Sequence, residues 1–422
     1  MILPGSPFLV RHGANLMLEQ VELAELAHRH GTPLYVYSRN AMRSAVAGYQ
    51  RALSGRRHLV CYAMKANSNL AVLQTFAQAG CGFDIVSAGE LERVLAAGGH
   101  ADRVVFSGVG KTRRDMARAL EAGVLCFNVE SEPELALLSE VARAHGVTAR
   151  ISLRVNPDVD ARTHPYISTG LKGNKFGVAH QRALDVYRHA ADLAGIQVAG
   201  IDCHIGSQIT EIDPYLDALD RILDLVEAVE GAGIPLHHID LGGGLGITYT
   251  DEQPPSPEQL LGAVLARLDA RGHGQREILL EPGRSLVGNA GVLLTEVLYL
   301  KPGEQKNFCI VDAAMNDMVR PAMYEAWMNI VPCVQREVPA TTWDIVGPVC
   351  ESGDWLGRER ALAVQAGDLL AMLSAGAYGF TMASNYNSRG RAAEVMVDGD
   401  QVHLIRSREA ATDLYALERL IP

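Results

Sequence analysis

The sequence predicts an α/β fold, a (β/α)8, TIM-like barrel followed by a second, mostly β C-terminal domain. Between residues 58 and 284, short apolar runs rich in β-branched residues alternate with longer segments of helical periodicity. There are eight such runs, the number of strands in a barrel of this kind. After about residue 288 the pattern changes to short strand-like runs separated by Gly, Pro and Asp. An open, doubly wound sheet remains an alternative, because a strand count alone does not show closure.

Each element of the barrel follows from its own stretch of sequence. The predicted strands are residues 58–65, 82–87, 103–107, 124–130, 149–156, 199–206, 237–242 and 277–281. The predicted helices between them are residues 70–79, 88–97, 113–122, 132–145, 181–194, 215–231 and 257–270. The long polar segment 158–177 is predicted to be a lid over the mouth of the barrel.

The second domain is predicted from six further apolar runs, at residues 292–299, 308–312, 343–346, 369–374, 393–397 and 402–406. We therefore expect a barrel over residues 31–288. Residues 1–30 and 289–422 would form the mostly β domain, which would contribute substrate-binding and dimer-interface residues.

Composition narrows the class of protein. The chain has 422 residues, of which 48% are hydrophobic and 21% charged, as in ordinary soluble globular proteins. A net charge of −11 argues against a nucleic-acid or anionic-membrane partner. The seven cysteines are scattered and include no Cys-x-x-Cys pair, so we expect no disulfide framework, no metal site and a cytoplasmic location. Neither a leader peptide nor a transmembrane segment is predicted.

The ends of the predicted strands carry polar residues or glycine at almost every position. They are Lys65, Asp84, Ser107, Asn128, Glu130, Arg154, Asn156, His204, residues 242–244 and residues 281–284. Loops are solvated, which explains one or two polar strand ends but explains all eight poorly. In a parallel barrel these ends meet at one mouth, so we expect the active site there.

The residues at these ends suit a planar cofactor that carries a phosphate. Lys65 ends an apolar strand, where a half-buried amine can act as a nucleophile, although a lysine that merely ends a strand in water is the alternative. His204 can stack on a ring, and Glu281 can keep a ring nitrogen protonated. Ser207 and the backbone of Gly243 and Gly244 can cradle a phosphate.

These motifs together resemble the fold-type III pyridoxal-phosphate decarboxylases, which share an alanine-racemase-like fold, and within them the diaminopimelate decarboxylases. The resemblance extends from about residue 30 to the C-terminus. It is carried by residues 62–67, 204–207, 242–246, 281–284, 164–171, 174–177, 320–324, 347–354, 377–379 and 385–389.

The resemblance implies a role for each matching residue, with pyridoxal 5'-phosphate as the cofactor. Lys65 would form the internal aldimine and Cys350 would be the proton donor. The other cofactor-binding residues would be His204, Ser207, Gly243, Gly244, Glu281, Gly283, Arg284 and Tyr378. Arg284, Arg320, Tyr324, Glu351 and Tyr378 would bind the substrate. In the family, the residues that match Cys350 and Glu351 come from the partner subunit, which implies a homodimer with shared sites.

The reaction so implied is decarboxylation of meso-2,6-diaminopimelate to L-lysine and carbon dioxide, the last step of lysine biosynthesis. A decarboxylase of ornithine, arginine or lysine is the first alternative, and a non-catalytic pyridoxal-phosphate-binding protein is the second. From the residues alone, Cys350 could equally be a small buried hydrophobe, and Arg320 a surface arginine beside a core tyrosine. A thiol can donate a proton at neutral pH, and the planar fork of arginine suits a carboxylate.

Overall fold

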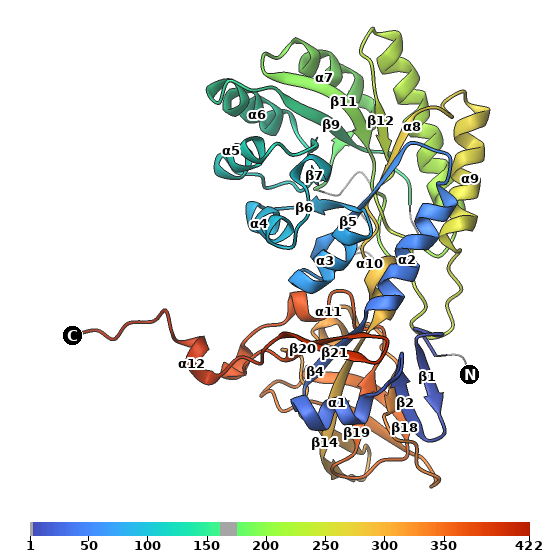
Figure 1. Cartoon of the computed structure of the whole chain (residues 1–422), viewed down its shortest axis with the longest axis vertical. Coiled ribbons are helices and arrows are strands. Elements are labelled where there is room, and N and C mark those ends of the chain that lie inside the picture. The colour runs from blue at the N-terminus through green and yellow to red at the C-terminus, as the bar shows by residue number, and fades with distance from the viewer. Residues whose placement is uncertain (1–2, 161–174) are drawn as a thin grey trace. The chain divides into compact units, whose positions relative to one another are not determined.

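The computed structural model describes residues 3–160 and 175–422 and divides into two compact units (Figure 1). The barrel unit comprises Arg43–Ile247 and Gln253–Leu286. The β-rich unit comprises Met1–Met42, Thr248–Glu252 and Val287–Pro422. The predicted lid, residues 158–177, lies mostly in residues 161–174, outside the described residues.

Eight parallel strands close into a ring in the barrel unit, which confirms the predicted barrel and excludes the open sheet. β13 pairs with β5, and β8 pairs with β9, so the order of strands returns to its start. The ring consists of β5 (His58–Ala63), β6 (Gly82–Ile85), β7 (Val104–Phe106), β8 (Cys126–Val129), β9 (Ala149–Asn156), β11 (Ile196–Asp202), β12 (His238–Asp240) and β13 (Glu277–Leu280). The short β10 (Val178–Ala179) adds to β9 outside the ring.

A helix of two or more turns follows each strand of the ring except β13, which is followed by a single helical turn, and all seven predicted helices are present. They are α3 (Leu70–Gln78), α4 (Ala88–Ala96), α5 (Arg113–Ala122), α6 (Glu132–Ala144), α7 (His180–Asp192), α8 (Asp213–Gly231) and α9 (Pro257–Ala270). Figure 1 shows α4 to α7 on the outer side of the strands. Ser87, Thr112, Ser131 and Ser256 cap four of these helices by accepting a backbone N–H. α2 (Arg39–Ala52) precedes the ring, and the one-turn α10 (Arg284–Val287) follows it.

The interior of the ring contains a buried polar chain below the strand ends. The hydroxyl of Ser152 lies 2.7 Å from His238 Nε2 and 3.3 Å from Cys126 Sγ. Gly200 makes room for this histidine, because a Cβ at that position would overlap the imidazole ring. Burial lowers the pKa of His238 to about 4, so its imidazole is neutral. The imidazole can therefore interact with Ser152 without a counterion.

The β-rich unit contains two sheets. β1 (Leu9–His12), β2 (Asn15–Leu18) and β3 (Val21–Glu22) form a small one, and α1 (Leu23–His30) follows. The larger sheet consists of β4 (Leu34–Ser38), β14 (Gly291–Lys301), β15 (Phe308–Val311), β16 (Ile330–Pro332), β17 (Thr341–Val346), β18 (Trp355–Leu362), β19 (Leu369–Met372), β20 (Ala393–Asp398) and β21 (Gln401–Arg406). The unit also contains α11 (Arg320–Tyr324) and α12 (Ala411–Leu414).

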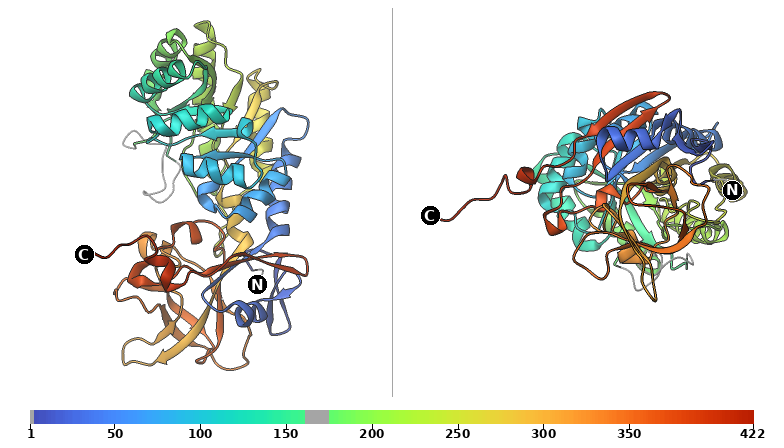
Figure 2. Two further views of the ribbon diagram at one scale, coloured as in Figure 1. Left: turned by 60° about the vertical axis from the view of Figure 1, so that its left-hand side comes forward. Right: turned by 90° about the horizontal axis from the view of Figure 1, so that it is seen from below.

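β4 joins the N-terminal segment to the C-terminal strands, because it pairs with both β14 and β20. Figure 2 shows these N-terminal elements in blue among the orange and red strands of the same unit. All six predicted strands of the second domain are present, whereas β1 to β4, β16 and β18 were not predicted. β16 has three residues and ends in proline, and β18 is an edge strand whose Arg358, Glu359 and Arg360 hide its apolar alternation.

Within the described ranges, no helix combines the length and the apolar character needed to cross a membrane.

Candidate active site

The mouth of the barrel brings together the polar residues predicted at the strand ends. Lys65 lies in a short 3-10 turn, Met64–Ala66, directly after β5. Its Nζ donates to Asp84 Oδ2 on the neighbouring β6 at 3.1 Å. The carboxylate is fully buried, whereas 44% of the lysine side chain is exposed. Solvent therefore reaches the amine while a buried carboxylate holds it in place.

Glu281 follows β13 and is held by two neutral donors. Its Oε1 accepts the amide N–H of Asn128 at 3.0 Å and the hydroxyl of Ser107 at 3.3 Å. Asn128 also donates to Ser107 Oγ, so the two donors support each other. Burial, followed by the charges of Asp240 and then of Asp84, raises the pKa of Glu281 well above its ordinary value.

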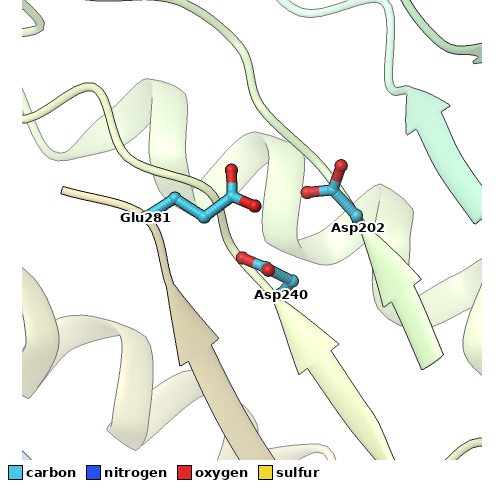
Figure 3. Close-up of side chains that lie close together, drawn as sticks. All are labelled: Asp202, Asp240 and Glu281. Carbon is cyan, nitrogen blue, oxygen red and sulfur yellow. The ribbon is translucent and has the colours of Figure 1, made fainter. Parts of the chain in front are cut away.

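Two further carboxylates lie beside Glu281, and Figure 3 shows the three side chains turned toward one another at the ends of adjacent strands. We call Asp202, Asp240 and Glu281 the carboxylate cluster. One oxygen from each lies within 4.8 Å of the others, and all three residues are buried. Burial raises the pKa of Asp202 well above its ordinary value and that of Asp240 to about 7. The cluster therefore retains protons near neutral pH.

Arg154, from β9, is a buried cation beside this cluster. Its Nη1 lies 3.2 Å from Glu130 Oε1, and its Nε lies 3.9 Å from Asp202 Oδ2. Burial acts to lower the pKa of Arg154, but the charges of Asp202 and Glu130 outweigh it and raise that pKa. The guanidinium therefore stays charged although the side chain is buried.

His204 comes two residues after the last residue of β11, and its ring is neutral. The backbone N–H of Gly243 donates to His204 Nδ1 at 3.3 Å, so that nitrogen carries no proton. Burial, followed by the charges of Arg154 and Lys65, lowers the pKa of His204 well below its ordinary value. A neutral imidazole held in this way can stack on a flat ring without adding charge.

The loop after β12 has room only for glycine. A Cβ at Gly243 would overlap the carbonyl oxygen of Glu281, and one at Gly244, where φ is +102°, would overlap that of Gly206. The nearby Arg284 donates from Nη2 to Ser207 Oγ at 3.2 Å. An arginine, a hydroxyl and a bare glycine backbone form a cradle that fits a phosphate.

The β-rich unit holds the other predicted residues, and Arg320 is the most constrained of them. This buried residue begins α11, with Pro321 next to it. Its Nη1 donates to Tyr249 Oη at 2.9 Å, and its guanidinium lies 4.9 Å from the centroid of that ring. Arg320 is therefore not the surface arginine of the alternative interpretation.

Cys350 is exposed, whereas the other six cysteines are buried. Its backbone N–H donates to Asn387 Oδ1 at 3.0 Å, and the side chain of Asp354 accepts the N–H of Val349 at 2.7 Å. The alternative of a small buried hydrophobe at Cys350 is therefore wrong.

Next to Cys350, the exposed Glu351 accepts a hydrogen bond from the hydroxyl of Tyr386 at 2.5 Å. In the same unit, Tyr378 is half-buried and has a φ of +56°.

Sequence reasoning did not single out Asp202, Asp240 or Tyr249. The spacing of residues along the strands could have identified the two aspartates. Each lies two residues before a residue that was predicted for the site, His204 and Gly242, and alternate residues of a strand share one face. Tyr249 gave no such signal, because its role depends on contacts with α11, far along the chain.

Comparisons with known proteins place these residues in a family. Residues 39–288 match the model of the pyridoxal-dependent decarboxylases, pyridoxal binding domain. The diaminopimelate decarboxylase of Pseudomonas aeruginosa is 59% identical over 97% of this chain and 98% of its own length. The diaminopimelate decarboxylase of Vibrio cholerae is 56% identical over 98% of this chain and 99% of its own length. The crystal structure of diaminopimelate decarboxylase from M. jannaschii in co-complex with L-lysine has a TM-score of 0.94 and 39% identity, and covers 99% of both chains.

The raised pKa of Asp240 predicts how the stability of the protein without cofactor depends on pH. An unfolded aspartate ionises near 3.8, whereas the folded one holds its proton to about 7. The folded state therefore binds the extra proton, and its stability falls as pH rises through this interval. The slope for one such proton approaches about 1.4 kcal/mol per pH unit.

Asp240→Asn should flatten that slope, measured by urea unfolding at a series of pH values. The matched control is Asp224→Asn on α8, where the side chain is 68% exposed, and this variant should keep the slope of the original protein. Equal slopes in Asp240→Asn and the original protein would show that Asp240 is already ionised in the folded state.

Proposed function

Because the chain belongs to the pyridoxal-dependent decarboxylases and, within them, to the diaminopimelate decarboxylases, we propose that it converts meso-2,6-diaminopimelate to L-lysine and carbon dioxide. The observation that carries this proposal is the identity of 59% over nearly the whole chain with one such enzyme. The reaction is the last step of lysine biosynthesis.

The barrel unit fits pyridoxal 5'-phosphate at each of its chemically distinct parts. Lys65 offers an accessible amine for the aldehyde carbon, and Glu281 a buried carboxyl for the ring nitrogen. His204 would lie against the ring. Ser207, Gly243, Gly244, Gly283 and Arg284 would hold the phosphate, with Tyr378 as a further contact. When bound, the cofactor supplies an electron sink for the pair left at Cα as carbon dioxide leaves.

Glu281 can hold a proton at the ring nitrogen because its environment supports both of its protonation states. Its buried position and the nearby carboxylates favour the protonated acid. The donors Asn128 and Ser107 stabilise the carboxylate that remains once the proton has moved. A proton can therefore be shared between Glu281 and the ring at little cost.

Recognition of the distal part of the substrate is proposed for the β-rich unit together with Arg284. Arg320 and Tyr324 would bind the distal carboxylate, and Glu351 would bind the distal ammonium. Tyr249 holds the guanidinium of Arg320 in a fixed plane. A substrate without a distal carboxylate would leave that buried cation without its counterion. Such sites can discriminate by about 10⁴-fold.

Cys350 is proposed to protonate the carbon from which carbon dioxide has left. Its exposure supports this role, because a buried thiol could not reach a substrate.

We further propose that the chain works as a homodimer in which Cys350 and Glu351 complete the site of the partner. We also propose that the protein is cytoplasmic. The seven unbridged thiols support a reducing compartment.

The first test compares substrates. The purified protein loaded with pyridoxal phosphate should release L-lysine from meso-diaminopimelate, detected by chromatography. Its kcat/KM for ornithine, arginine and lysine should be lower by about 10⁴-fold, because these molecules lack the distal carboxylate. A faster reaction with ornithine would instead favour the basic-amino-acid decarboxylase.

The second test mixes two inactive or slow variants and addresses Lys65, Cys350 and the dimer together. Lys65→Ala should lose the absorbance of the covalently held cofactor, whereas Cys350→Ala should keep it and turn over slowly. If each site takes one residue from each subunit, a re-assembled equal mixture has one intact site in each mixed dimer. It should therefore recover about one quarter of full activity. A mixture no more active than the mean of its parents would contradict shared sites.

The third test concerns Arg320. Arg320→Lys keeps the charge but loses the planar fork, so kcat/KM for meso-diaminopimelate should fall about 10- to 100-fold, mostly through KM. Tyr249→Phe keeps the ring under the guanidinium and removes only its hydroxyl, so its effect should be smaller. Arg358→Lys is the matched control, because Arg358 is an exposed arginine 4.0 Å from the ring of Trp355 in the same unit. Equal effects of Arg320→Lys and Arg358→Lys would refute the proposed contact.

A further inference from the structure

The carboxylate cluster holds more acidic groups than pairing with a ring nitrogen requires. Glu281 alone can form that pair, yet Asp202 and Asp240 lie buried beside it. We propose that Asp202 and Asp240 are positioning residues that keep a proton on Glu281, ready for the cofactor's ring nitrogen, and hold it there after binding. This inference rests on the proposed function, since it requires pyridoxal phosphate in this pocket.

The hydrogen bonds of the two aspartates support this role. Asp240 Oδ1 accepts the N–H of Gly242 at 2.9 Å. Asp240 Oδ2 and both carboxylate oxygens of Asp202 are buried and have no hydrogen-bond partner among the described residues. A buried carboxylate without donors is costly to ionise, and a proton shared with a neighbouring carboxylate lowers that cost.

Carboxylates outnumber cations among the side chains that face the pocket. The carboxylates come from five different strands or strand ends, and the cations from two. They are Asp84, Glu130, Asp202, Asp240 and Glu281, against Lys65 and Arg154, with His204 neutral and the thiols Cys61 and Cys203 beside them. Lys65 contacts Asp84, and Arg154 is divided between Glu130 and Asp202. Full ionisation would put three excess negative charges on buried side chains, so protons remain there instead.

The proton transfer balances within the pocket. As the cofactor enters, the O–H bond of Glu281 breaks and an N–H bond forms on the ring. The electron pair of the former O–H bond stays on the carboxylate, which Asn128 and Ser107 already solvate. No proton has to come from solvent. Any carboxylate of the cluster that ionises as pH rises then opposes loss of the ring proton, because that loss would leave the pocket more negative.

The test follows the ring proton directly. Each protein is loaded with pyridoxal phosphate that carries ¹⁵N in the ring, and the ¹⁵N chemical shift is recorded against pH in the presence of a chelator. In the original protein the shift should remain that of a protonated ring well above neutral pH. Asp240→Asn removes a carboxyl that becomes negatively charged only above about pH 7, at nearly constant shape, and should lower the midpoint by about one pH unit or more. Asp202→Asn should also lower the pH midpoint of the ¹⁵N shift, and Asp224→Asn should leave that midpoint unchanged.

A second measurement needs no substitution. The infrared spectrum of the cofactor-free protein should contain a protonated carboxyl band that weakens when pyridoxal phosphate binds. The inference is overturned if that band does not change, or if both cluster variants bind the cofactor but keep the original midpoint. Failure of the proposed function would look different, because the original protein would then not bind pyridoxal phosphate covalently.

Discussion

Closure of the parallel barrel is the constraint on which the rest of the structure depends. The pairings of β13 with β5 and of β8 with β9 turn eight separate strand ends into one ring. Residues as distant in sequence as Lys65 and Glu281 then lie at the same mouth, because their strands are neighbours in the ring. Glu281 in turn reaches Ser107, directly after β7, and Asn128 within β8, and these strands lie three and four places away around the ring. No open sheet would allow these contacts across its width.

Closure of the barrel also brings several carboxylates together where they are buried. Strand ends that converge on an enclosed mouth lose water, so the carboxylates of Asp202, Asp240 and Glu281 are buried close together. Burial of one unpaired carboxylate is unfavourable, and burial of three is tolerated only if protons or cations stay with them. Arg154 supplies part of this compensation, and retained protons supply the rest. The same environment that disfavours charge therefore makes the pocket a source of protons.

Most of the fold follows from local sequence, and the errors have physical causes. The eight barrel strands and seven helices were predicted because apolar periodicity is set within a few residues of the chain. β18 was missed because an edge strand can carry charges along its exposed side. Lys65, His204 and Glu281 were predicted for the site as strand ends with suitable chemistry, and Ser207 was predicted as a hydroxyl that suits a phosphate. Tyr249 could not be found in this way, since its contact with Arg320 joins residues 71 positions apart.

The division into two units separates two kinds of chemical recognition. In the function proposed above, the residues of the barrel unit would address features that every amino-acid substrate of such a cofactor shares, namely the ring, the phosphate and the reacting amine. Apart from Arg284, none of the barrel residues assigned here depends on the far end of the substrate. Under that proposal, choice of substrate would depend mainly on residues such as Arg320 and Glu351, which belong to the β-rich unit. This separation allows the β-rich unit to change its specificity while the barrel keeps the cofactor and its proton, because the carboxylate cluster lies wholly within the barrel unit.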